Sequence, residues 1–214
     1  MASKVGITRF FGTNCDEDIR KWMVLKNHKP QYLWQDDQFN SDDYDFIIIP
    51  GGFSYGDYLR CGALAARAPV MKSVQEFAKK GKPILGICNG FQILCEAGLL
   101  PGVLTRNKDL RFIDQIVELE VTSTNNYFSK KLTQKNQIKL PIAHGEGNYF
   151  NEAEELKRLM DQDQIWLTYK SNPNGAALNI AGITNKQRNV CGLMPHPERA
   201  LFEWMGSSDG DLFL

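Results

Sequence analysis

The chain has 214 residues, with 25 basic and 25 acidic side chains and therefore no formal net charge. That length suits one domain covering residues 1–214, and a hydrophobic content of 43% is enough to fill its core. The balanced charge argues against a nucleic-acid partner, which needs a basic face, and no apolar run is long enough to span a membrane. The first residues lead straight into a strand pattern without a secretory signal, so we expect a cytoplasmic protein.

Five cysteines are scattered through the chain without the paired spacing of a zinc site, so we expect no bound metal. Their odd number and their scatter fit a reducing compartment. Most of the five, which include Cys15, are expected to be small residues of the core, and Cys61, Cys95 and Cys191 in particular are interpreted as packing residues. Cys88 stands out because of its surroundings.

The first half of the chain alternates between strand-like and helix-like patterns. The expected strands are 4–10, 29–35, 44–50 and 83–87, and the expected helices are 14–28, 63–80 and 89–100. In the first helix the inner positions should be Ile19, Trp22, Met23 and Leu25, with Asn14 as N-cap. Such alternation predicts an α/β fold with a mostly parallel central sheet, a flavodoxin-like core and helices on both faces.

The second half changes character and predicts an antiparallel extension of that sheet. The expected strands are 115–125, 137–150, 164–170, 175–185 and 189–196, with one short charged helix at 152–161. No repeat or linker interrupts the chain, which supports one domain.

Cys88 stands in Gly86-Ile87-Cys88-Asn89-Gly90, where a strand-like run changes to a helix-like run. A sharp strand-to-helix turn crowds the backbone, and a glycine two residues away on each side relieves the crowding. The residue at the tip then projects over the first turn of the helix, whose positive potential favours the reactive thiolate. Cys88 is therefore a candidate nucleophile, and the N–H of Asn89 a candidate oxyanion donor.

A thiolate nucleophile needs a base, and the chain has three histidines. His28 lies at a charged helix end, whereas His196 stands between two prolines that favour an extended backbone. In an extended chain His196 and Glu198 face the same way, so the carboxylate can orient the imidazole. These residues predict a Cys88–His196–Glu198 triad.

Another glycine pair, Gly51-Gly52, follows the buried run that ends at Pro50. Sites in parallel sheets form at the carboxyl ends of strands, so this pair should lie beside Cys88. The N–H of Gly52 is the predicted second donor to the oxyanion. A phosphate-binding loop is the alternative, but no Gly-Lys-Ser/Thr sequence follows.

Four stretches of the chain, "PGGFSYGDYLR", "GICNGFQIL", "AHGEGNY" and "MPHPERA", resemble the triad (class I) glutamine amidotransferases. Their wording is most similar to the branch that forms a separate glutaminase subunit in de novo purine synthesis. The similarity covers essentially the whole chain. One departure is the C-terminus, where only "DLFL" follows the Ser-Asp-Gly turn, so a final helix is expected to be short or missing.

The resemblance implies that L-glutamine is hydrolysed to glutamate and ammonia through a thioester on Cys88. It implies the same triad and oxyanion donors, and it adds a substrate-binding set: Gln92, His144, Gly145, Glu146 and Gly147. A packed loop histidine is the alternative interpretation of His144.

The resemblance also implies partners. A large synthetase subunit would use ATP and Mg to convert formylglycinamide ribonucleotide to its amidine, a small auxiliary subunit would join the two, and this chain would hold no cofactor. The loop that follows Gly52 carries three residue types enriched at interfaces, and they are the predicted docking residues: Tyr55, Tyr58 and Arg60. A plain surface loop is the alternative for that segment.

Two other protein classes are compatible with part of the pattern. Hydrolases and chaperones with an elbow cysteine on a parallel sheet would share the Cys88 setting, but they would not explain "PHPE". A non-enzymatic binding subunit would carry the triad as a vestige.

Overall fold

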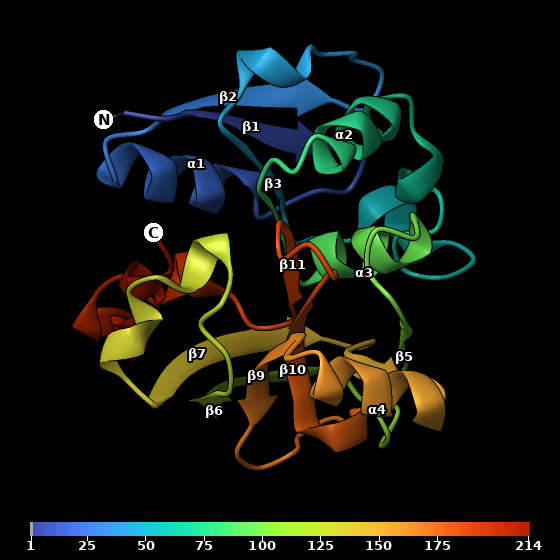
Figure 1. Ribbon diagram of the computed structural model, residues 1–214, viewed down its shortest axis with the longest axis vertical. Coiled ribbons are helices and arrows are strands. Elements are labelled where there is room, and N and C mark those ends of the chain that lie inside the picture. The colour runs from blue at the N-terminus through green and yellow to red at the C-terminus, as the bar shows by residue number, and fades with distance from the viewer. Residues whose placement is uncertain (1) are drawn as a thin grey trace.

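The computed structural model describes residues 2–214. A nine-stranded sheet runs through the molecule in the order β2-β1-β3-β4-β11-β10-β9-β6-β7 (Figure 1). The parallel half consists of β1 (Lys4–Arg9), β2 (Lys29–Trp34), β3 (Phe46–Ile49), β4 (Ile84–Ile87) and β11 (Val190–Leu193). The antiparallel half consists of β10 (Ile180–Thr184), β9 (Ile165–Tyr169), β6 (Ile113–Val121) and β7 (Gln137–His144). This arrangement confirms the predicted parallel sheet and its antiparallel extension.

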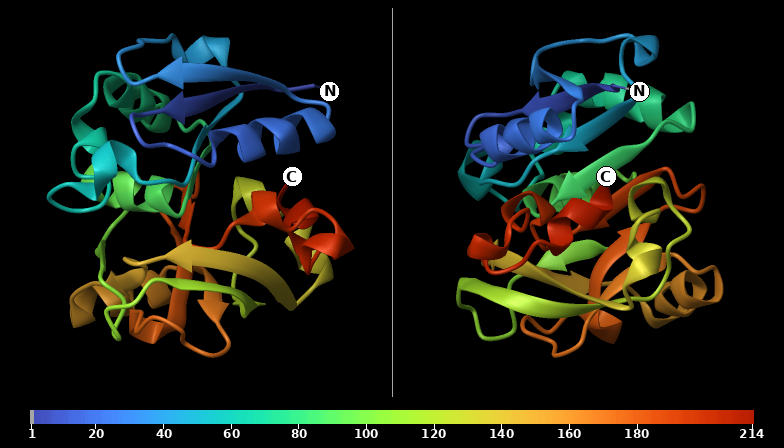
Figure 2. Two further views of the ribbon diagram at one scale, coloured as in Figure 1. Left: turned by 180° about the vertical axis from the view of Figure 1, so that it is seen from behind. Right: turned by 90° about the vertical axis from the view of Figure 1, so that its left-hand side faces the viewer.

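Four α-helices accompany the sheet in the described residues: α1 (Asp16–Leu25), α2 (Val70–Lys79), α3 (Asn89–Glu96) and α4 (Ala153–Asp161). The second view of Figure 2 shows α1 and α2 on opposite sides of the first strands, as expected for a parallel α/β sheet. A small antiparallel pair, β5 (Val103–Thr105) with β8 (Asn148–Phe150), lies beside the main sheet. None of the helices between residues 2 and 214 combines the length and the apolar character needed to cross a bilayer.

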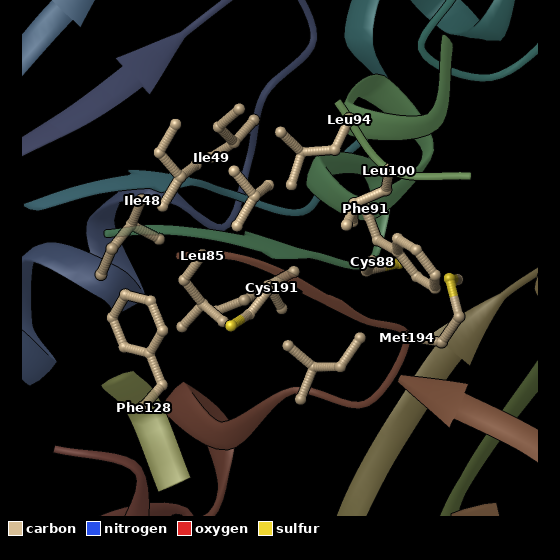
Figure 3. Close-up of a cluster of buried hydrophobic side chains, with 14 of the residues drawn as sticks. Ile48, Ile49, Leu85, Cys88, Phe91, Leu94, Leu100, Phe128, Cys191 and Met194 are labelled. Atoms are coloured by element: carbon tan, nitrogen blue, oxygen red, sulfur yellow. The ribbon is translucent and has the colours of Figure 1, made fainter. Parts of the chain in front are cut away.

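The core consists mainly of aliphatic and aromatic side chains from the central strands and from α3. Figure 3 shows Ile48 and Ile49 of β3, Leu85 of β4 and Phe91 of α3 around the end of β4, and these four side chains are fully buried. Strands β3, β4 and β11 are buried along their whole length, which explains their continuous apolar sequences. The carboxyl ends of these strands are therefore held in place by close packing of the buried strands.

Several predicted boundaries are wrong, each for a local reason. The expected helix 63–80 is interrupted, because Pro69 holds Ala68 in an extended conformation (ψ 149°) and α2 begins only at Val70. The expected strand 137–150 divides into β7 and β8 at the glycine-rich segment 145–147. A short 3-10 helix, Ala177–Asn179, precedes β10.

The first helix also differs from expectation at its ends. Asn14 does not cap it; Cys15 occupies the N-cap position and makes no side-chain cap. Trp22 and Met23 are fully buried as predicted, whereas Leu25 in the last turn is 56% exposed. The chain ends in a short 3-10 helix, Asp209–Phe213, in which Phe213 is buried.

Candidate active site

The turn at Cys88 connects β4 directly to α3. Cys88 itself has φ +52° and ψ −108°, a conformation that only a tightly constrained turn imposes on a non-glycine residue. A Cβ added to Gly90 would lie 1.9 Å from the carbonyl oxygen of Ile49, and one added to Gly86 would lie 2.6 Å from that of Gly90. The two glycines thus let α3 approach β3 and β4 closely, and the thiol stands at the N-terminus of α3.

His196 and Glu198 form a buried pair just beyond β11. His196 is extended (φ −106°, ψ 91°), and its Nδ1 lies 2.6 Å from Oε1 of Glu198. Each residue is only 2% exposed. Burial lowers the pKa of His196, but the Glu198 carboxylate and the neighbouring Cys88 raise it, and the net shift is upward. Nε2 has no hydrogen-bond partner among residues 2–214, which leaves it free for proton transfer.

Gly51 marks the place where the elbow and the histidine meet. A Cβ added there would lie 2.8 Å from Cε1 of His196 and 3.4 Å from Cβ of Cys88. Cys88 and His196 therefore flank the same glycine at the end of β3, as the prediction of a site at the carboxyl strand ends requires. The structure brings the three predicted triad residues together.

The predicted oxyanion donors lie on two sides of Cys88. Gly52 has φ +142°, which favours glycine, and it lines a cavity together with Cys88. Asn89 is the first residue of α3, so its N–H has no carbonyl partner within the helix. Its side chain accepts a hydrogen bond from the N–H of Ser54 at 3.2 Å and thereby ties the glycine loop to α3.

The cavity next to Cys88 has a volume of about 260 Å³. Gln92 lines it, but the side-chain amide of Gln92 is already engaged within the protein. It accepts a hydrogen bond from Nδ2 of Asn89 at 2.8 Å and donates one to the carbonyl oxygen of Glu146 at 2.6 Å. Gln92 therefore connects two walls of the cavity, a role that the prediction of a substrate contact did not include.

The segment from His144 to Gly147 forms another wall of the cavity, and sequence reasoning missed the residue that holds it. Asn107 is 1% exposed. Its Oδ1 accepts from the N–H of Gly147 at 3.0 Å and lies 3.1 Å from Nδ1 of His144. Burial and the charge of His196 lower the pKa of His144 to about 4, so its imidazole is neutral.

The predicted docking residues do not form one free surface. Tyr58 is 74% exposed, but the hydroxyl of Tyr55 donates to Oε1 of Gln35 at 2.5 Å and its ring packs on Phe11. Arg60 pairs with a carboxylate of α3 at 2.7 Å. Tyr58 and Arg60, whose side chain is 67% exposed, are therefore the accessible members of the set.

Cys15 is a further residue at the site, which the sequence did not single out, and it is buried. Its Sγ would lie 3.1 Å from a Cβ at Gly51 and accepts a hydrogen bond from Nη2 of Arg199 at 3.1 Å. Sγ of Cys15, a ring nitrogen of His196 and a carboxylate oxygen of Glu198 all lie within 4.8 Å of one another. Burial raises the pKa of the Cys15 thiol, despite opposing contributions from His196 and Arg199. The sequence did hold a signal for this position, because Cys15 comes after the carboxyl end of β1, the strand that lies beside β3 in the sheet.

An elbow cysteine beside a buried histidine–carboxylate pair, at the carboxyl ends of a parallel sheet, is the arrangement of the triad glutamine amidotransferases. The profile of the CobB/CobQ-like glutamine amidotransferase domain matches residues 2–210, and the chain belongs to this family.

Individual relatives show which members of this family the chain is similar to. The chain is 50% identical over 210 residues to phosphoribosylformylglycinamidine synthase subunit PurQ of Helicobacter hepaticus, with 98% of this chain and 95% of that protein covered. It is 51% identical over 208 residues to subunit PurQ of Prochlorococcus marinus strain MIT 9312, covering 96% and 93%. Among solved structures, PurLQS from Thermotoga maritima contains a chain with a TM-score of 0.91 and 41% identity, covering 100% of this chain and 96% of that one.

Proposed function

We propose that this chain is the glutaminase subunit of phosphoribosylformylglycinamidine synthase in purine biosynthesis. The observation that carries the proposal is the strained elbow of Cys88 beside the buried His196–Glu198 pair, in a chain about half identical to PurQ proteins over nearly its full length. It hydrolyses L-glutamine and delivers the ammonia to an ATP-dependent synthetase subunit.

The first half of the reaction forms a thioester. The thiol proton of Cys88 passes to Nε2 of His196, and the sulfur attacks the side-chain amide carbon of glutamine. The N–H groups of Gly52 and Asn89 stabilise the negative oxygen of the tetrahedral intermediate. His196 returns the proton to the leaving nitrogen, the C–N bond breaks, and ammonia departs.

The second half hydrolyses the thioester. His196 takes a proton from water, the resulting hydroxide attacks the thioester carbon, and the C–S bond breaks as the proton returns to sulfur. Glu198 holds the imidazole by its Nδ1 throughout and stabilises the imidazolium. Glutamate is released and the thiol is restored.

The ammonia requires a protected path to a second active site, because ammonium, its main form in neutral water, is not a nucleophile. We infer that a large subunit of the PurL type supplies the ATP and Mg site and that a small auxiliary subunit of the PurS type helps to join the two. The PurLQS assembly of Thermotoga maritima supports a complex of this kind. The backbone N–H of Phe53 bonds to the carbonyl oxygen of Gly12, and Tyr58 follows five residues later. Tyr58 is exposed and is a candidate contact for that complex.

The test measures glutamate release and amidine formation by this chain mixed with its large and auxiliary subunits. We expect glutamine-dependent amidine synthesis to require this chain, and synthesis from added ammonia to proceed without it. Cys88→Ser should abolish the glutamine reaction, whereas the matched variant Cys95→Ser, at the other end of α3, should retain it. Amidine synthesis from glutamine by the large subunit alone would refute the proposal.

The same mixture separates the two other classes of protein. A hydrolase or chaperone with an elbow cysteine would leave amidine synthesis unsupported. A non-enzymatic binding subunit would bind the large subunit, but a glutamine-mimicking electrophile would not label its Cys88.

A further inference from the structure

Cys15 lies beside the His196–Glu198 pair, and the reaction described above leaves its thiol unused. The sulfur of Cys15, a ring nitrogen of His196 and a carboxylate oxygen of Glu198 all lie within 4.8 Å of one another. Each of the three residues is only 2% exposed. Ligand atoms around a tetrahedral zinc ion are about 3.5 Å apart. Small movements would therefore bring these three atoms around a metal ion.

Two polar atoms of this cluster have no partner in the folded chain. Nε2 of His196 and Oε2 of Glu198 are buried, and neither makes a hydrogen bond within residues 2–214. A buried polar atom without a partner is unfavourable. Proton transfer accounts for Nε2, but no step of the reaction uses Oε2 of Glu198. A cation bound beside Cys15 would give this oxygen a partner.

The side chains around Cys15 are those that an outer shell of a metal site requires. Nη2 of Arg199 donates to Sγ of Cys15 at 3.1 Å, and Nε of Arg199 lies 3.3 Å from Oδ2 of Asp18. The hydrogen bond to sulfur orients the thiol, and Asp18 balances the guanidinium charge that would otherwise oppose a cation. The side chains of Arg199 and Asp18 are 37% and 40% exposed. The cluster therefore lies directly beneath an accessible ion pair, which gives an ion a short path from solvent.

We propose that Cys15, His196 and Glu198 form a binding site for Zn²⁺, and that the bound ion inhibits the glutaminase. Thiolate sulfur, imidazole nitrogen and carboxylate oxygen are the ligands that zinc takes in proteins. The thiolate and the carboxylate together balance the charge of the ion. The sequence did not predict this site, because its ligands come from residue 15 and from the segment after β11 and not from a paired spacing.

A zinc ion at this site removes His196 from the reaction, whichever ring nitrogen it takes. On Nε2 the ion occupies the atom that receives the proton from Cys88. On Nδ1 it breaks the 2.6 Å contact with Oε1 of Glu198, and the imidazole loses the orientation that this contact provides. The ion is thus an inhibitor and not a cofactor. Its inhibitory effect rests on the proposed function, whereas its binding does not.

Titration of the full chain with Co²⁺, which replaces zinc and reports a thiolate ligand by a charge-transfer absorption band, tests binding directly. The Cys88→Ser variant is the starting point, so that the nucleophile contributes no sulfur ligand. We expect the band in Cys88→Ser and in the matched control Cys88→Ser/Cys95→Ser, and its loss in Cys88→Ser/Cys15→Ser. A band that survives the loss of Cys15, or no band in Cys88→Ser, would overturn the site.

A second variant, Cys88→Ser/His196→Ala, keeps the test decisive if the Cys15 variant does not fold. Loss of an outer-shell partner alone typically lowers metal affinity about 10–100-fold, so loss of the imidazole ligand should lower cobalt affinity at least about tenfold. Equal cobalt affinities with and without His196 would overturn the site.

Inhibition is measured in the assembled complex at buffered concentrations of free Zn²⁺. We expect zinc to slow amidine synthesis from glutamine but not from added ammonia, and the Cys15→Ser complex to need at least about tenfold more zinc for the same fractional loss. Equal zinc sensitivity of the two complexes, or equal inhibition of the two reactions, would overturn inhibition at this site. A complex that makes no amidine from glutamine even without zinc would instead refute the proposed glutaminase function, while the cobalt titration would still decide whether the site exists.

Discussion

Replacing Gly90 by alanine tests whether the elbow depends on the close approach of α3 to β3. The new Cβ would lie 1.9 Å from the carbonyl oxygen and 2.7 Å from the carbonyl carbon of Ile49. These are backbone atoms of a buried strand, so no flexible side chain can move aside. Overpacking of a core costs about 1–3 kcal/mol, and because the backbone itself must shift here, we expect the free energy of unfolding to fall by about 3 kcal/mol.

Urea unfolding, followed by the fluorescence of the buried Trp22 and Trp166, measures this loss. With a slope of about 2–3 kcal/mol per molar urea, the midpoint should fall by about 1–1.5 M. Gly145→Ala is the control, because its Cβ would meet only Phe112, at 3.8 Å, and should change stability by less than about 0.5 kcal/mol. Equal midpoints for Gly90→Ala and Gly145→Ala would refute the steric argument.

Two further predictions concern the histidines. The pKa of His144 falls from 6.5 to about 4 on folding, so its contribution to stability is complete above pH 6.5 and is lost as the pH falls to about 4. The loss should amount to about 3 kcal/mol, and a His144→Gln variant measured by urea unfolding across this range should lack it; parallel pH profiles would contradict the assignment. His196→Ala should slow glutamate release at least a thousandfold, which is roughly the effect of removing one member of a catalytic triad. Glu198→Gln should slow glutamate release by a smaller factor. The double variant should be about as slow as His196→Ala alone, whereas additive losses would show that the two residues act independently.

The sequence was most informative where local geometry has a strict requirement. A glycine on each side of Cys88 and a proline on each side of His196 specify backbone shapes, and the structure has both. The position of Gly51 against both residues also follows, because strands β3, β4 and β11 are parallel neighbours whose ends must coincide. Positions that depend on backbone shape and strand order could therefore be predicted.

Residues that act through distant partners could not be predicted in this way. Asn107 contacts Gly147 forty positions later in the chain, and the amide of Gln92 bonds to Glu146 fifty-four positions away. No local pattern distinguishes either residue from an ordinary buried amide. Cys15 was not singled out either, because its place after β1 indicates only the same end of the sheet, whereas the folded structure places its thiol beside Gly51.

The presence of two cysteines at the site makes the identity of the nucleophile the central claim. Cys15 and Cys88 both lie against Gly51 beside His196. Mixing the complex with L-glutamine, quenching rapidly in acid and mapping modified peptides by mass spectrometry would locate the glutamyl thioester. We predict the adduct on Cys88, its loss in Cys88→Ser and its persistence in Cys15→Ser. An adduct on Cys15, or glutamate release by Cys88→Ser at the wild-type rate, would contradict the account.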